Sequence, residues 1–252
     1  MNLIRLISEI ADKTYAVIEQ NVKTSSQSQF RTSFKSPIEK YMLNVKNAEK
    51  HIFDGNIDFK KNIMPLKILN GEINSMKYDQ LKCFLQSDLY IVFGSSFIKG
   101  WLANFLEKNK ALNVHMGLSP YYRGSACNFW ALYDSLPNFV GGTVHLLTKG
   151  LDSGPIIFHS VPKYSNENLF EFTMNAVKQT QEDLVYFLKR FKKEEIKAFE
   201  QNKDFQIRYS RVTEFTAEIA KEFVSRKLTT EQIIFLISNT VKPNLIEIPR
   251  FN

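Results

Sequence analysis

The sequence contains three polar side chains whose types and surroundings could support proton-transfer chemistry. Asn113 and His115 lie at the end of the apolar run 111–115, and their spacing places both side chains on one side of an expected strand. Asp152 lies in the glycine- and proline-containing turn 151–155. An amide, an imidazole and a carboxylate in one site could activate a nucleophile and hydrogen-bond to an oxyanion. Each also has an ordinary interpretation, as a turn asparagine, a buried histidine or a capping aspartate, and the three alone do not decide between these.

Motifs for most other familiar chemistries do not occur in the chain. It has no G-x-G-x-x-G fingerprint after a strand, no Walker-type lysine loop, no H-E-x-x-H and no G-x-S-x-G. His115, His145 and His159 lack the close pairing of a zinc site, so we expect that the protein needs no metal. Cys127 could be a nucleophile assisted by a histidine, but a lone cysteine at a helix start is more often a small buried residue.

Glycines and aromatic residues gather in one part of the chain. Eight of the ten glycines lie between Gly94 and Gly154, and so do both tryptophans. Glycine allows tight turns and the close approach of a ligand, so this part is the expected site region, although the loops of an α/β fold also need glycine. The aromatic stretch 127–133 could line a ligand pocket, but aromatic residues at helical spacing usually pack against a core.

Apolar periodicity indicates alternating helices and strands. The continuous run 89–93 is typical of a strand buried on both faces of a parallel sheet. The alternation predicts an α/β fold with a mostly parallel sheet, helices on both of its faces and a small C-terminal appendage. We expect a catalytic domain over residues 1–192 and a mostly helical extension over residues 193–252. The expected helices are 1–14, 37–51, 76–87, 100–109, 126–133, 167–191, 214–226 and 230–238; the expected strands are 15–19, 65–69, 89–93, 111–115, 142–147, 156–159 and 205–209, with a loop at 21–36.

Composition indicates a soluble, reduced, cytoplasmic protein. The chain has 252 residues, a net charge of +7 and two cysteines, and it has no apolar stretch near the ~20 residues that would cross a bilayer. Arg5 and Glu9 interrupt the only apolar region at the amino terminus, which argues against a secretory signal. The positive excess is mostly lysine and is scattered along the chain, which argues against a nucleic-acid partner and for surface solubility. We expect no membrane partner.

Four motifs occur in the order seen in the formyltransferases that use 10-formyltetrahydrofolate. They are Asn113-Val114-His115, the loop 118–124 (LSPYYRG), 142–145 (GTVH) and 152–157 (DSGPII). The chain resembles this family over roughly residues 66–160; the family includes glycinamide ribonucleotide transformylase, methionyl-tRNA formyltransferase and the N-formyltransferases of nucleotide-linked amino sugars. The resemblance implies a Rossmann-like α/β fold and 10-formyltetrahydrofolate as the formyl donor.

The resemblance also implies roles for particular residues. Asn113, His115 and Asp152 match the catalytic positions of the family. Asn113 and protonated His115 would stabilise the oxyanion of a tetrahedral intermediate, and Asp152 would keep His115 oriented and receive the proton of the attacking amine. The pterin ring of the donor would lie against two segments, Phe93, Gly94, Ser95, Ser96 and Phe97 in one and Phe139, Gly141, Gly142 and Thr143 in the other. A plain hairpin turn is the alternative explanation for the pair of glycines.

The chain departs from the family in its opening segment. The family opens with a buried strand and a glycine-bearing loop, whereas this chain begins in a helix, so that strand is either missing or replaced by another segment. We expect formyl transfer to a primary amine of a nucleotide-linked amino sugar. The alternatives are a methionyl-tRNA formyltransferase-like enzyme, a hydrolase of the same donor, and a folate-binding module without catalysis. A homodimer is considered, although the sequence does not identify the oligomeric state.

Overall fold

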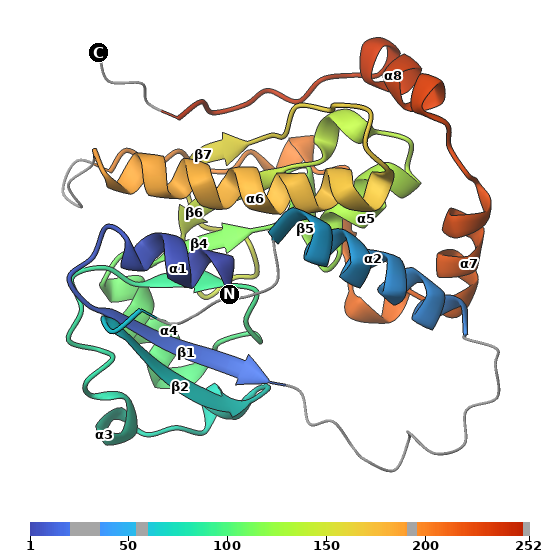
Figure 1. The fold of residues 1–252 in the computed structure, drawn as a ribbon. Helices are drawn as coiled ribbons and strands as arrows, with labels where there is room; N and C mark the ends of the chain where they lie inside the picture. Colours follow the sequence, from blue (N-terminus) through green and yellow to red (C-terminus); the bar gives the residue numbers. More distant parts are fainter. Residues whose placement is uncertain (21–35, 54–59, 191–195, 249–252) are drawn as a thin grey trace, which may run out of the picture.

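The computed structural model describes residues 1–20, 36–53, 60–190 and 196–248, and it shows an α/β fold (Figure 1). The expected loop 21–36 lies outside the described residues, except for Ser36. The last residue of the expected helix 167–191 and the last four residues of the expected extension also lie outside them. The helices are α1 (Asn2–Ser8), α2 (Pro37–Phe53), α3 (Tyr78–Leu81), α4 (Gly100–Lys108), α5 (Cys127–Tyr133), α6 (Leu169–Leu188), α7 (Ala217–Ser225) and α8 (Thr230–Asn239). The strands are β1 (Thr14–Gln20), β2 (Ile63–Leu69), β3 (Ile91–Phe93), β4 (Leu112–His115), β5 (Tyr122–Gly124), β6 (Gly142–Leu146), β7 (Ile156–Ser160) and β8 (Arg208–Ser210).

The described strands form one four-stranded sheet and two strand pairs. The sheet has the order β3-β4-β6-β7, and the pairs are β1-β2 and β5-β8. Three of the five pairings are parallel, namely β1-β2, β3-β4 and β5-β8, whereas β6 runs antiparallel to both of its neighbours. The connection 147–155 between β6 and β7 is shorter than the dozen or so residues that a parallel crossover needs. This short connection explains why β6 and β7 pair antiparallel. The expected α/β class with parallel strands is confirmed.

Helices cover both faces of the strands, as expected. Leu112 and Val114 of β4 share a core with α1 and α6 on one face. On the other side, α3 and α4 pack with β1 and β2 around Leu81, Leu102 and Leu106. In Figure 1 α6 lies across the sheet, with α1 beside it. A third core, which contains Trp130 and Phe139, surrounds α5. Because side chains alternate along a strand, the polar residues of β4 point away from α6.

A strand lies near the amino terminus, after the first helix. This strand, β1, follows α1 and pairs in parallel with β2 over its whole length, from Thr14 opposite Ile63 to Gln20 opposite Leu69. That β1 replaces the opening strand of the family stays a prediction. The residues that follow β1 lie outside the described part of the chain.

The expected helix 1–14 ends at Ser8, strand β5 was not expected, and three further elements differ from the periodicity. The expected helix 76–87 is helical only over α3, and residues 82–85 form turns. The helix expected at 214–226 begins at Ala217, because the Thr216 hydroxyl caps it by accepting from the Ile219 amide, and a 3-10 turn (Val212–Glu214) precedes it. The strand expected at 205–209 is displaced to β8, because the side chain of Asn202 caps a 3-10 turn (Lys203–Phe205). Local side-chain hydrogen bonds compete with regular structure at these points.

The C-terminal residues pack against the rest of the chain. β8 pairs with β5, and Phe223 of α7 is buried in the core around α5. After α8 the chain runs back past β7, where the His159 amide donates to the carbonyl of Ile246 (Figure 1). The domain boundary at residue 192 stays a prediction.

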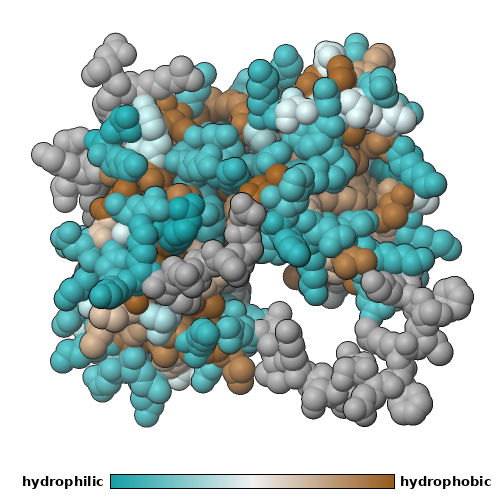
Figure 2. Space-filling model, in the orientation of Figure 1, coloured by the Kyte–Doolittle hydropathy of each residue, from teal (hydrophilic) through white to brown (hydrophobic). Residues whose placement is uncertain are grey.

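Hydrophilic residues cover most of the face seen in Figure 2, and hydrophobic residues lie between them in small groups. In the described part of the chain, none of the helices combines the length and the apolar character that a membrane span requires.

Candidate active site

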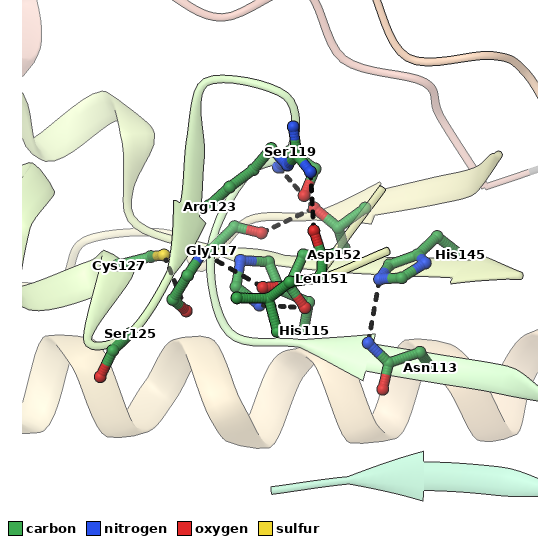
Figure 3. A network of polar contacts seen from close by, with 12 residues as sticks. Asn113, His115, Gly117, Ser119, Arg123, Ser125, Cys127, His145, Leu151 and Asp152 are labelled. Carbon is green, nitrogen blue, oxygen red and sulfur yellow. Dashed lines mark hydrogen bonds and ion pairs between the residues drawn. The ribbon is translucent and has the colours of Figure 1, made fainter. Parts of the chain in front are cut away.

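Strand β4 positions the first two polar residues. Asn113 lies opposite His145 of β6, and His115 lies opposite Thr143. Because Leu112 and Val114 are buried against α6, the side chains of Asn113 and His115 lie together on the other face of the sheet (Figure 3). Asn113 is partly exposed, whereas His115 is buried.

A folded-back loop brings Asp152 to His115. Residues 147–155 leave β6 at Leu146, which is paired with Leu112 at the start of β4, the end away from His115. The loop nevertheless places Oδ1 of Asp152 3.4 Å from Nδ1 of His115. The carboxylate thus reaches the imidazole across the face of the sheet and not from a neighbouring strand end.

Several contacts hold this loop in place. Arg123 donates to the carbonyl of Leu151 at 2.7 Å, and the side-chain amide of Gln201 donates to the carbonyls of Asp152 and Gly154 at 2.9 and 2.8 Å. Asp152 has a φ of +47°, a left-handed conformation that aspartate adopts more readily than most residues. These contacts fix the position of the carboxylate on both sides of its Cα.

Asp152 also accepts from the main chain of β5. The amide of Gly124 donates to Oδ2 at 3.1 Å. A glycine is required there, because its φ is +94° and a Cβ would collide with the carbonyl of Ser210 in β8. The pairing of β5 with β8 therefore positions one of the hydrogen-bond donors to the Asp152 side chain.

The two ring nitrogens of His115 face two oxygen-bearing groups. Nε2 lies 3.2 Å from the carbonyl of Tyr122, and Nδ1 faces the Asp152 carboxyl group. The Tyr122 carbonyl can only accept, so Nε2 is the donor in that contact. His115 and Asp152 are 8% and 9% exposed, so water screens this pair weakly.

His145 completes the arrangement, and its ring is neutral. Nδ1 lies 2.8 Å from the carbonyl of Leu146, to which it must donate, and Nε2 lies 3.0 Å from Nδ2 of Asn113. His145 is 1% exposed, and its burial lowers its pKa. A neutral ring with its proton on Nδ1 therefore accepts from Asn113. This contact orients the Asn113 amide and leaves its second N–H for another acceptor.

His145 is the residue that sequence reasoning missed. His145 belongs to the motif 142–145 and to the histidines without zinc-site spacing, but the sequence predicted no role for its side chain in the site. Its place opposite Asn113 was the available signal, because adjacent strands 111–115 and 142–147 with polar residues on one face would place the two side chains together.

The segment 139–143 lies in the interior. Phe139 is buried against Tyr121 and Tyr122. The hydroxyl of Thr143 donates to the carbonyl of Gly117 at 2.6 Å and accepts from the amide of Ser119 at 2.9 Å, so it holds the chain that follows β4.

Close packing explains the two glycines of this segment. A Cβ on Gly141 would collide with the carbonyl of Ser160, and one on Gly142 with the side chain of Thr180 in α6. Both residues lead from a 3-10 turn (Pro137–Phe139) into β6, so they do not form a hairpin turn between two strands. Contact with the donor through these glycines stays a prediction.

The loop after β3 is more open. Phe93 pairs with Val114, so residues 94–97 leave the sheet beside the end of β4. Gly94 has a φ of +58° with open space around its Cα, and Gly94, Ser95 and Phe97 are exposed. Ser96 is partly buried and bonded to Glu19. Both expected donor segments thus lie beside the end of β4 that carries His115, with the first facing solvent and the second facing the core.

Cys127 is not a reactive thiol. It is buried at the start of α5, and this burial, followed by the charge of Asp152, raises the pKa of the thiol. A thiol that stays protonated is a poor nucleophile. In the ranges that the structure describes, no three His, Cys, Asp or Glu side chains are grouped to hold a metal ion.

A cavity of about 560 Å³ lies elsewhere in the molecule, between α8, the 3-10 turn Pro137–Phe139 and residues 161–166. It contains none of the site residues expected from the sequence. Asn113, His115 and Asp152 therefore meet on the face of the sheet at β4 and not in this cavity.

Comparison with known proteins relates this geometry to one family. The model of the family described as formyl transferase matches residues 83–188, a range that contains Asn113, His115, His145 and Asp152. A search of curated proteins found no match. The chain is similar in structure to the formyltransferase PseJ from Anoxybacillus kamchatkensis, solved with UDP-4,6-dideoxy-4-formamido-L-AltNAc and tetrahydrofolate, at 15% identity and a TM-score of 0.52 over 89% of this chain and 99% of that one.

A second similar structure is a 4-N formyltransferase from Francisella tularensis, with 17% identity and a TM-score of 0.48 over 83% of this chain and 86% of that one. Phosphoribosylglycinamide formyltransferase from Anaplasma phagocytophilum gives 14% identity and a TM-score of 0.44 over 70% and 86% of the two chains. At 15% identity, the similarity to the PseJ structure shows a shared fold.

Proposed function

Because the formyl transferase family model matches residues 83–188, we propose that the protein transfers a formyl group from 10-formyltetrahydrofolate to a primary amine of a nucleotide-linked amino sugar. The observation that carries this proposal is the convergence of Asn113, His115 and Asp152 on one face of the sheet, inside the matched range. The PseJ structure contains a nucleotide-linked sugar together with tetrahydrofolate, which supports this choice of acceptor.

The site residues suit the charges that form during the reaction. The amine attacks the formyl carbon, and the carbonyl oxygen becomes an oxyanion. The N–H of Asn113 that His145 leaves unused would donate to this oxygen, and the charge of His115 would stabilise it. His115 acts mainly through its charge, because its two N–H groups face Tyr122 and Asp152.

Asp152 would handle the proton. The attacking nitrogen loses a proton, which the Asp152 carboxylate accepts directly or through a water molecule. As the bond from the formyl carbon to the folate nitrogen breaks, that nitrogen gains a proton, so the site returns to its starting state. The Gly124 amide and the His115 ring hold the Asp152 side chain in place before the reaction.

The exposed loop 94–97 would receive the donor. Its open space at Gly94 lies beside the end of β4, so a flat ring bound there would place its formyl group near Asn113. The residues present therefore fit a folate donor.

The test is formyl transfer with a labelled donor. Purified protein is incubated with formyl-labelled 10-formyltetrahydrofolate and a panel of UDP- and dTDP-linked 3-amino and 4-amino sugars. We expect label in one sugar product, and we expect Asp152→Asn to abolish it. Release of labelled formate with every acceptor would identify a hydrolase, and label in methionyl-tRNA would identify a different acceptor class. Donor binding without either product would leave a folate-binding module, and each of these three outcomes contradicts the proposal.

A further inference from the structure

Side chains, not a strand ladder, join the two parts of the fold beside the donor loop. In the described part of the chain, β1 and β2 form a pair that does not hydrogen-bond to β3 through a sheet ladder. The loop after β3 nevertheless lies against the ends of this pair. Two side chains make the connection, Glu19 from β1 and Asn74 from the 3-10 turn after β2 (Glu72–Asn74).

Glu19 binds the loop with both carboxylate oxygens. Oε2 accepts from the Ser96 amide at 2.6 Å, and Oε1 accepts from the Ser96 hydroxyl at 2.7 Å and from the Gly71 amide at 2.9 Å. Burial alone would raise the pKa of Glu19, but these donors outweigh it and the net effect is a lowered pKa. One ionised carboxylate thus holds the ends of three successive strands, β1, β2 and β3.

Asn74 holds the following residues of the loop. Its Nδ2 donates to the carbonyl of Phe97 at 3.0 Å, and its Oδ1 accepts from the amide of Lys99 at 2.7 Å. We call Glu19 and Asn74 the loop clamp. Together they fix the main chain from Ser96 to Lys99 and leave the exposed Gly94 and Ser95 outside their contacts.

We propose that the loop clamp positions the donor-binding loop, so that Glu19 and Asn74 set the affinity for the folate donor without contacting it. This rests on the proposed function, because residues 94–97 count as a donor loop only if the chain uses a folate. Since Glu19 already occupies the amide of Ser96, the donor is read through other groups of the loop.

Substitution of Glu19 should therefore change the Kd for the donor more than the KM for the acceptor or kcat. Glu19→Ala removes the acceptors of the Ser96 amide and hydroxyl, and we expect the Kd for the donor to rise by about tenfold. Glu19→Gln keeps one oxygen for the Ser96 amide, so we expect a smaller rise, about threefold. The KM for the amine acceptor and kcat should stay within about twofold, because Asn113, His115 and Asp152 keep their contacts.

Glu72 provides the matched control. Its carboxylate accepts from the Leu69 amide at 2.7 Å, in the same 3-10 turn as Asn74, and none of its described contacts reaches the loop. Glu72→Ala should leave the Kd for the donor unchanged.

The experiment is isothermal titration of each variant with 5-formyltetrahydrofolate, followed by formyl-transfer kinetics and thermal melting. If the wild-type protein binds no folate, the proposed function fails. If the wild type binds and Glu19→Ala and Asn74→Ala bind equally well, the clamp inference fails and the proposed function stands. If Glu19→Ala melts below the assay temperature, the donor affinities of Glu19→Gln and Asn74→Ala test the inference in its place. Equal losses in donor affinity, acceptor KM and kcat would mark a general structural role and overturn the inference.

Discussion

Replacing His145 with phenylalanine tests the orientation of Asn113. Phenylalanine fills a similar volume but neither accepts from the Asn113 amide nor donates to the Leu146 carbonyl, so both hydrogen bonds, at 3.0 and 2.8 Å, are lost. Asn113 is partly exposed and can turn toward water, whereas in the native site its second N–H is directed by His145.

The size of the effect follows from that geometry. One hydrogen bond contributes about 1 kcal/mol. If this whole free energy serves to orient Asn113, losing the hydrogen bond lowers kcat by about fivefold. Removal of an oxyanion donor altogether lowers kcat by at least about 100-fold. We therefore expect kcat of His145→Phe to fall by between about fivefold and about 100-fold, with Asn113→Ala at or beyond the upper limit.

Steady-state kinetics of both single variants and of the double variant form the assay. If His145 acts only through Asn113, the double variant should have the kcat of Asn113→Ala alone. His159→Phe is the control: His159 is also buried and hydrogen-bonded, to the carbonyl of Ser119 at 2.7 Å, but it does not contact Asn113. Unchanged kcat in His145→Phe, or losses that simply add in the double variant, would refute the reasoning.

The same substitution changes the response to pH. Burial lowers the pKa of His145 to about 4, well below the value of about 6.5 for an unfolded histidine. Between these values the unfolded chain binds the additional proton, so the free energy of unfolding falls as the pH falls from about 6.5 to about 4, by up to about 1.4 kcal/mol per pH unit. In urea unfolding, His145→Phe should lose less free energy of unfolding over this pH range than the parent protein. A loss equal to that of the parent would mean that the additional proton of the unfolded chain binds a group other than His145.

The other predictions concern the carboxylate, metals and packing. Asp152→Asn should lower the rate of formyl transfer by about 1000-fold, with the donor affinity within a few-fold of the parent. His115→Ala should lower the rate of formyl transfer by about 100-fold. If Asp152→Asn instead lowered the single-turnover rate and the titrated donor affinity equally, Asp152 would be a binding residue. Activity should survive dialysis against EDTA, and a loss that zinc restores would show a metal requirement. Gly142→Ala should lower the free energy of unfolding by about 1–3 kcal/mol in urea, because the added methyl collides with Thr180, and a neutral result would mean that α6 moves aside.

Much of the fold could be predicted from periodicity, because most elements are amphipathic or uniformly apolar. The apolar run before Gly94 and the alternation at Asn113 and His115 correspond to β3 and β4. Strand direction was less accessible, because side-chain alternation is the same in parallel and antiparallel strands. The length of 147–155 held the available information, since it is too short for a crossover.

The candidate site could be predicted by residue type but not by its connections. Asn113 and His115 share a face, as their spacing predicts. The approach of Asp152 depends on a loop that folds back, which local sequence does not encode. The bond between Asn113 and His145 depends on strand register, and that of Glu19 with Ser96 joins residues 77 positions apart. Contacts of this kind arise from tertiary packing and leave no periodic signal.

The contacts that support Asp152 come partly from outside the matched segment 83–188. Gln201 binds the main chain at Asp152 and Gly154, and β8 sets the conformation of Gly124, whose amide binds the carboxylate. Both supports lie after residue 192, whereas the family match ends at residue 188. A chimera that joins residues 1–192 to the tail of another formyltransferase would keep Asn113, His115 and Asp152 but lose the frame around Asp152. A transplanted or redesigned site would therefore need the matched segment together with the residues after 192 that support Asp152.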